Sequence, residues 1–139
     1  MTYATAQDMV LEFGDDEIRQ LSDRSNTGEI DPGILQSALV WADSVINDHI
    51  RGIYSIPLNP VPVSINRVAM ELAWSSMHNT LKPEAIQARE NAAMKYLQRV
   101  RTGMVVLESG EKLSQSSIGG AAKKGERDRV FTKDTLAGF

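Results

Sequence analysis

The stretch with the clearest chemical potential is DRSNTGEIDPGI, residues 23–34. Side chains that carry oxygen recur at alternate positions of this stretch, and a glycine stands sixth. A helix–loop–helix calcium loop places ligands at its first, third, fifth and ninth positions and requires glycine at the sixth. The spacing therefore supports one hypothesis, a divalent-cation-binding helical module whose ligands are Asp23, Ser25, Thr27 and Asp31.

The same stretch departs from a calcium loop at its twelfth position. Ile34 stands where the loop requires a bidentate glutamate, and two hydroxyls replace two carboxylates. Asp31 precedes Pro32, which is the pattern of a helix N-cap followed by a proline in the first turn. We therefore favour a structural turn in which Asp23 bonds the local backbone and Gly28 adopts a positive φ.

Other patterns of catalysis or metal binding are missing from the sequence. There is no cysteine, which excludes disulfides and thiolate-bound metals. His49 and His78 have no second metal ligand at helical spacing, and neither a G-x-S-x-G elbow nor a P-loop occurs. We expect no cofactor and no enzymatic activity. A small hydrolase whose residues are scattered along the chain stays open as an alternative.

Composition narrows the class of protein further. The chain has 139 residues, 42% of them hydrophobic, and a net charge of −3. This balance argues against a nucleic-acid binder, because phosphate contacts require basic surface. The longest apolar stretches, such as MVVL at 104–107, fall far short of the roughly 20 residues that cross a bilayer. The N-terminus also lacks the basic region of a signal peptide.

Residue spacing predicts a mainly α fold, a small bundle of about five helices. Thr5 and Asp8 form a capping-box pattern, and Ser64 is expected to cap a later helix. Gly14 and Gly103 follow apolar-periodic segments, as glycines that end helices do. The first expected helix runs from 5 to 14, and a second, short helix begins at 15. Three longer helices are expected from 32 to about 51, from 64 to about 79, and from 83 to about 102.

Two segments are expected to contact other molecules. Residues 55–63, SIPLNPVPV, contain three prolines and predict an exposed, extended connection, in which Ile56 and Leu58 are candidate partner contacts. The helix that follows is apolar on more than one side over residues 65–77, as central helices and subunit interfaces are. We expect one subunit to leave part of this helix uncovered.

The stretch 104–107 is expected to form a short strand.

The composition changes at residue 108. Residues 108–127 are rich in Gly, Ser and Lys, too polar to offset the entropy of ordering them. Apolar residues return at Val130, Phe131, Leu136 and Phe139. We therefore expect a helical domain over 1–107 and a flexible arm over 108–139, whose hydrophobic end becomes ordered on a partner.

Several separated blocks of the sequence suggest a family. They are YATAQDMVLEFGDDEIRQLSDRSNTGEID, ALVWADSVINDHIRGIYSIPL, RVAMELAWSSMH and the ending RVFTKDTLAGF. In this order they resemble the Mu-like phage and prophage family of small head–tail connector proteins, a family of head-completion adaptors. The likeness covers residues 2–107 and returns at 128–139.

The resemblance implies a structural protein of the virion. Such adaptors form a ring, usually of twelve copies, beneath the portal protein at the head–tail junction, after assembly in the host cytoplasm. The implied partners are copies of the chain itself, the portal, and a tail-side connector or tail terminator. Genomic DNA would pass through the channel without specific binding, and no membrane is involved.

Overall fold

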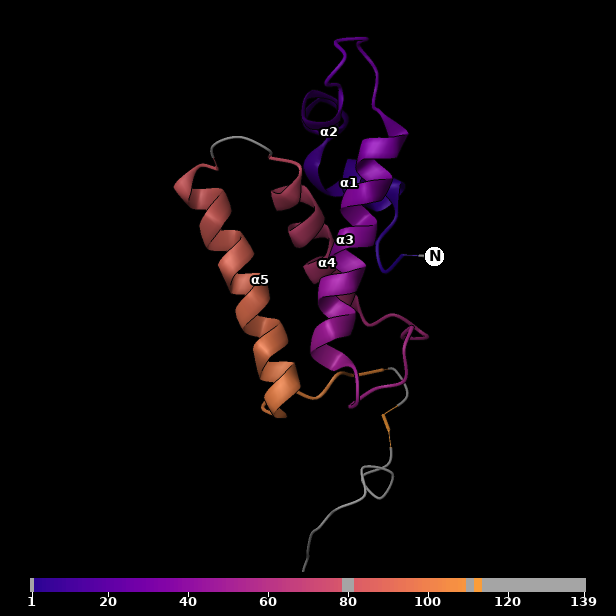
Figure 1. Ribbon diagram of the computed structural model, residues 1–139, viewed down its shortest axis with the longest axis vertical. Helices are drawn as coiled ribbons and strands as arrows, with labels where there is room; N and C mark the ends of the chain where they lie inside the picture. The colour runs from indigo at the N-terminus through magenta and orange to yellow at the C-terminus, as the bar shows by residue number, and fades with distance from the viewer. Residues whose placement is uncertain (1, 79–81, 110–111, 114–139) are drawn as a thin grey trace, which may run out of the picture.

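A computed structural model describes residues 2–78, 82–109 and 112–113 of the chain. It contains five α-helices, and the described residues form no β-strand (Figure 1). The mainly α fold with five helices is thereby confirmed. The helices are α1 (Ala6–Phe13), α2 (Asp15–Ser22), α3 (Pro32–Ile50), α4 (Val63–Ser76) and α5 (Glu84–Thr102).

The three longer helices form the body of the molecule. Helix α4 packs against both α3 and α5, and α3 also contacts α5. The short helices α1 and α2 cover the end of the body where α3 begins (Figure 1). Among the described residues, no helix combines the length and hydrophobicity needed to span a bilayer.

Local sequence sets most helix ends as expected. Thr5 and Asp8 form a complete capping box at α1, and Gly103 ends α5 in the left-handed region at φ 88°. The predicted cap at Ser64 is wrong. Helix α4 begins one residue earlier, because Pro62 at φ −62° and ψ 149° directs the chain into the helix at Val63.

Helix α4 is the centre of the hydrophobic core. Ile65, Leu72 and Ala73 are fully buried, and even Met70 and Trp74 on its flank keep only 7% and 8% of their surface exposed. The expectation that one subunit leaves part of this helix uncovered is therefore wrong. Contacts from α1, α3 and α5 cover its several apolar sides within a single chain.

The proline-rich connection lies against the body. Leu58 is only 2% exposed, and its backbone N–H donates to the Tyr3 hydroxyl at 3.2 Å. Ile56 is half-buried beside the core. The prediction of an exposed connection is therefore wrong at Leu58, because the N-terminal segment folds over it.

Residues 104–107 form no strand, so that prediction is also wrong. Leu107 is buried, and its N–H donates to the Tyr54 hydroxyl at 2.9 Å. The N–H of Leu113 donates to the Ile53 carbonyl at 2.8 Å, so the chain stays on the body past residue 107. The rest of the predicted arm, residues 114–139, lies outside the described residues.

Candidate functional site

The turn at residues 23–28 is built around the carboxylate of Asp23. Its Oδ1 accepts from the Thr27 N–H at 2.7 Å and from the Thr27 hydroxyl at 3.0 Å, and its Oδ2 accepts from the Gly28 N–H at 2.6 Å. These bonds, above all the one from the Thr27 backbone, lower the pKa of the Asp23 carboxyl. Gly28 adopts φ 83°, as the turn hypothesis expected.

The other candidate cation ligands have different positions. Asp31 Oδ1 accepts from the backbone N–H groups of Gly33 at 2.9 Å and Ile34 at 3.3 Å, so it caps α3. Ser25 is exposed to solvent. In the part of the chain that the structure describes, no three His, Asp or Glu side chains gather in a way that could hold a metal. The geometry therefore favours the structural turn.

Each histidine ring lies within hydrogen-bonding distance of a helix carbonyl four residues earlier in the chain. His49 Nδ1 lies 2.8 Å from the Val45 carbonyl, and His78 Nδ1 lies 2.9 Å from the Trp74 carbonyl. The His78 ring also packs edge-on against the indole of Trp74. Both rings are thus held in packing positions.

The predicted partner contacts fall in two places. Ile56 and Leu58 pack on the core, so the buried surface of Leu58 is used within the subunit. Val130, Phe131, Leu136 and Phe139 lie outside the described residues. The partner roles of all six residues stay predictions.

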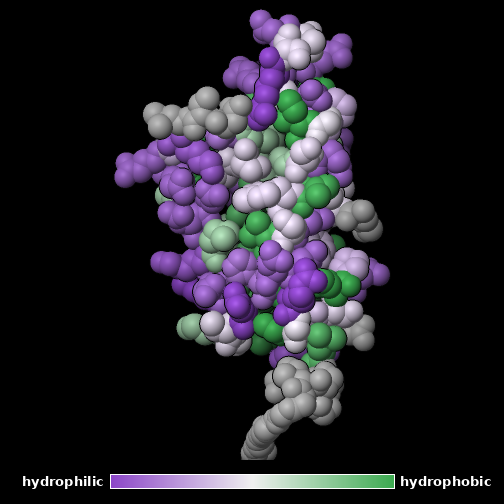
Figure 2. Space-filling view, viewed as in Figure 1, coloured by the Kyte–Doolittle hydropathy of each residue, from purple (hydrophilic) through white to green (hydrophobic). Residues whose placement is uncertain are grey.

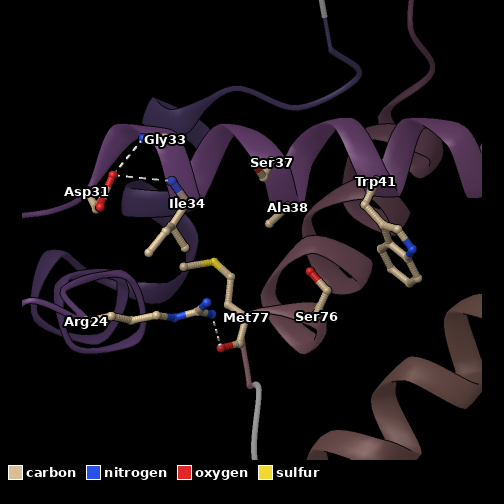
Figure 3. Close-up of a pocket in the computed structure, with 9 residues that line it drawn as sticks. All are labelled: Arg24, Asp31, Gly33, Ile34, Ser37, Ala38, Trp41, Ser76 and Met77. Carbon is tan, nitrogen blue, oxygen red and sulfur yellow. Dashed lines mark hydrogen bonds between the residues drawn. The ribbon is translucent and has the colours of Figure 1, made fainter.

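A groove of about 750 Å³ runs between the first half of α3 and the end of α4 (Figure 3). We call it the α3–α4 groove. Ile34, Ala38 and Met77 lie along its middle, and Trp41, which is 42% exposed, projects at the far end (Figure 3). Arg24 and Asp31 lie at the near end, where Arg24 Nη2 donates to the Met77 carbonyl at 3.4 Å. Ala38 and Met77 are only 7% and 2% exposed, and Ser37 and Ser76 also line the groove, so its middle is mixed in polarity and its near end is charged.

Sequence reasoning did not identify the α3–α4 groove. Its lining comes from the turn after α2, from one face of α3 and from the end of α4, which are far apart in the chain. The one available signal was Trp41, a large aromatic residue beside the apolar stripe of its helix. A single flanking residue does not reveal which segments lie opposite it.

A second hollow, of about 410 Å³, lies between α4 and α5 and has a mostly apolar lining that includes Val68 and Tyr96. Arg89 stands at its edge and donates to Glu71 at 2.5 Å. The Arg89 guanidinium also lies 4.7 Å from the centroid of the Trp74 ring. This edge of the hollow therefore holds an ion pair that joins the two helices.

Exposed apolar side chains also gather on the surface. Figure 2 shows hydrophobic residues in a broken line down the middle of the visible face, with mostly hydrophilic residues over α5. Beyond α5, Met104 is 78% exposed, Val106 is 64% exposed and Leu113 is 38% exposed. Side chains of this kind often mark protein–protein contacts when they lie together.

Comparison with known proteins identifies the family. No curated protein sequence matches the chain. The sequence profile of the family described as Bacteriophage Mu, Gp36 matches residues 3–123, a span that includes all five helices. This match agrees with the expectation of a Mu-like phage protein. The chain belongs to the bacteriophage Mu Gp36 family.

Proposed function

We propose that this protein is a structural component of the virion that forms a ring at the portal vertex and connects head to tail. In this role copies of the chain contact each other, the portal protein above and a tail-side connector or terminator below. The ring is assembled in the host cytoplasm, and genomic DNA passes through it without specific binding.

The observation that carries the proposal is the exposed apolar segment after α5 in a member of a Mu phage family. Met104 and Val106 expose 78% and 64% of their surface, although Leu107 beside them is buried. Exposed apolar side chains that form a contiguous patch often mark protein–protein contacts. In the sequence, the polar residues 108–127 separate this segment from the hydrophobic peptide at 128–139.

The charge of the body also supports a conduit for DNA. Residues 1–107 carry 9 basic and 13 acidic side chains, a net charge of −4. An acidic wall repels phosphates, so DNA slides past it.

Deletion of residues 128–139 tests the proposal. We expect the truncated protein to keep its helical circular dichroism, because the five helices and the described core lie within residues 2–109. We expect it to lose binding to purified portal, as seen by negative-stain imaging of portal particles. Portal docking that is unchanged by the deletion would contradict the role of the peptide.

A matched pair of surface variants tests the segment after α5. Replacing Met104 and Val106 by serine removes apolar surface from the proposed contact, whereas Val40→Ser removes it from α3, where Val40 is 53% exposed. We expect the first change to weaken either binding to the portal or assembly of the ring. The second change should leave binding to the portal intact. Equal effects of both would argue against this segment as the contact.

A further inference from the structure

The exposed side of the second half of α5 is basic. Lys95, Arg99 and Arg101 are all exposed, and residues 91–107 contain no acidic side chain. Within the described part of the chain, none of these three bases forms an ion pair. We call them the α5 basic face. Their charge is available to a partner.

Exposed apolar side chains continue this face past the end of the helix. The Val105 N–H donates to the Arg99 carbonyl at 3.2 Å, so the chain folds back onto the last turn of α5. Met104 and Val106 stand on either side of Val105, and both are exposed. The molecule thus presents a basic surface and an apolar surface side by side.

The complementary pattern lies beside α2. A hollow of about 290 Å³ is lined by the acids Asp15 and Glu29, together with Arg19, Gly28 and Ile30. Arg19 is bonded to Asp15, whereas Glu29 has no hydrogen-bond or ion-pair partner among the described residues. We call this the acidic hollow. It can receive a basic side chain.

A second hollow, of about 220 Å³, adjoins the acidic hollow, because Ile30 lines both. Its lining is mostly apolar and consists of Ala6, Val10, Ile30, Pro32 and Leu35 together with Gln7 and Gln36. We call the two the paired hollows. They offer an acidic place next to an apolar one, as the α5 basic face offers bases next to Met104 and Val106.

One chain cannot bring these two surfaces together. Ile30 comes directly before α3, whereas the chain after α5 lies past the other end of α3, where the Leu107 N–H donates to the Tyr54 hydroxyl (Figure 1). The 19 residues of α3 extend over about 28 Å. The matching surfaces therefore stand at opposite ends of the body and can meet only between copies.

We propose that the α5 basic face of one copy docks on the paired hollows of a second copy, with bases at the acidic hollow and the exposed apolar segment over the apolar hollow. This proposal rests on the proposed ring, because it names the contact between neighbours. Two different surfaces meet, so the contact is head-to-tail and repeats from copy to copy, as it does in closed rings.

The surfaces favour a copy of the chain over DNA as the partner. Phosphates would also attract Lys95, Arg99 and Arg101, but they offer nothing to Met104 and Val106 beside them. Opposite charges between two protein surfaces orient the partners and exclude wrong ones. Each exposed ion pair contributes little, so we expect weak association of the free protein that decreases as salt is added.

Two charge reversals and their mixture test the contact in the full-length protein. Arg99→Glu changes the α5 basic face and Glu29→Lys changes the acidic hollow, and both positions are exposed. At low salt each variant alone should self-associate about tenfold more weakly than wild type, because like charges then face each other. An equimolar mixture should recover wild-type association, because the two reversed surfaces match and so do the two unchanged ones. Sedimentation velocity measures association, and circular dichroism verifies the fold.

Glu84→Lys is the matched control. It makes the same charge change as Glu29→Lys at an exposed position in the first turn of α5, about 22 Å along the helix from Arg99, and α5 contributes no residue to the paired hollows. Its self-association should stay within about twofold of wild type. Mixing it with Arg99→Glu should recover nothing.

Three results would overturn the contact. The first is a mixture of Arg99→Glu and Glu29→Lys that associates no better than either variant alone. The second is a wild-type protein that stays monomeric at low salt and at its highest soluble concentration. The third is a short DNA duplex that binds wild type but not Arg99→Glu, with no recovery in the mixture, which would assign the basic face to nucleic acid.

The portal experiment remains separate. Recovery in the mixture without any portal docking by the wild-type protein would uphold the contact between copies and contradict the head–tail function. Portal docking by wild type without recovery in the mixture would do the reverse.

Discussion

Single carboxylates in this protein have structural roles that their sequence context only partly reveals. Asp23 forms a turn because backbone N–H groups and one hydroxyl converge on its oxygens. Asp43 lies half-buried on α3, where its Oδ1 accepts from the Tyr3 N–H at 3.0 Å. The two environments shift the pKa values of these carboxyls in opposite directions.

The turn hypothesis predicts that Asp23→Ala lowers stability, whereas Ser25→Ala does not. The first change leaves the N–H groups of Thr27 and Gly28 without their acceptor, and the second removes an exposed hydroxyl. Urea unfolding measures both. Millimolar calcium should not raise the melting temperature of the wild-type protein, and a rise that Asp23→Ala abolishes would restore the cation-site hypothesis.

Burial raises the pKa of Asp43, against a smaller opposing effect of the Tyr3 N–H. A raised folded-state pKa means that this group contributes stability below its unfolded pKa, and the contribution is lost as pH rises through the folded pKa. We expect Asp43→Asn, which keeps an acceptor for Tyr3, to be at least as stable as wild type near pH 7. The stability of wild type relative to the variant should improve toward about pH 3.

Thermal unfolding across this pH range measures the difference. Asp48→Asn is the control, because it makes the same change of net charge on the same helix. The Asp48 side chain is 74% exposed, so this variant removes a charge without removing a buried carboxyl. An identical pH dependence in both variants would show that net charge, and not burial, is responsible.

At the scale of elements, one cluster ties three helices together. The rings of Phe13 in α1 and Trp74 in α4 stack at 4.7 Å with an interplanar angle of 6°. Arg89 of α5 lies 4.7 Å from the Trp74 ring centroid and 5.7 Å from that of Phe13, and it pairs with Glu71 of α4. Helix α5 is thereby held at its N-terminal half by a planar cation as well as by its apolar face.

We expect Arg89→Ala to reduce the free energy of unfolding by about 1–3 kcal/mol, through the lost ion pair and the lost cation–π contacts. Arg89→Lys should recover only part of this loss, because an ammonium group does not stack as a guanidinium does. Urea titration measures each variant. Arg99→Ala, at an exposed position of the same helix, is the control and should change stability by less than about 0.5 kcal/mol.

At the scale of the whole molecule, the core closes within one subunit. The central helix α4 buries Ile65, Leu72 and Trp74 without a second copy. We therefore expect one subunit to fold without assembly, in contrast to the expectation from the helix alone. Exposed apolar residues lie outside this core. Besides Trp41 at the groove and Met104, Val106 and Leu113 after α5, they include Leu11, Val40, Val63 and Met94.

This closure predicts that protein without residues 128–139 folds as a monomer. In about 0.5 M salt, which screens the contact proposed between copies, its melting temperature should stay constant over about a hundredfold range of protein concentration, because no dimer contributes to stability. Calorimetry at several concentrations measures it. A melting temperature that rises steadily with concentration would show that a surface within residues 1–127 joins the copies.

The sequence by itself determined the helices and the turn. Caps and turns depend on neighbouring residues, as the Thr5–Asp8 box, the Asp31 cap and the Asp23 turn do, so a short stretch contains all the information. Only the tertiary structure decided which apolar residues are covered and where the α3–α4 groove lies. Tyr3 covers Leu58, and Ile34 meets Met77, across gaps in the chain that no local pattern spans. Burial depends on these distant contacts, and for that reason the sequence placed Leu58 at the surface and left α4 uncovered.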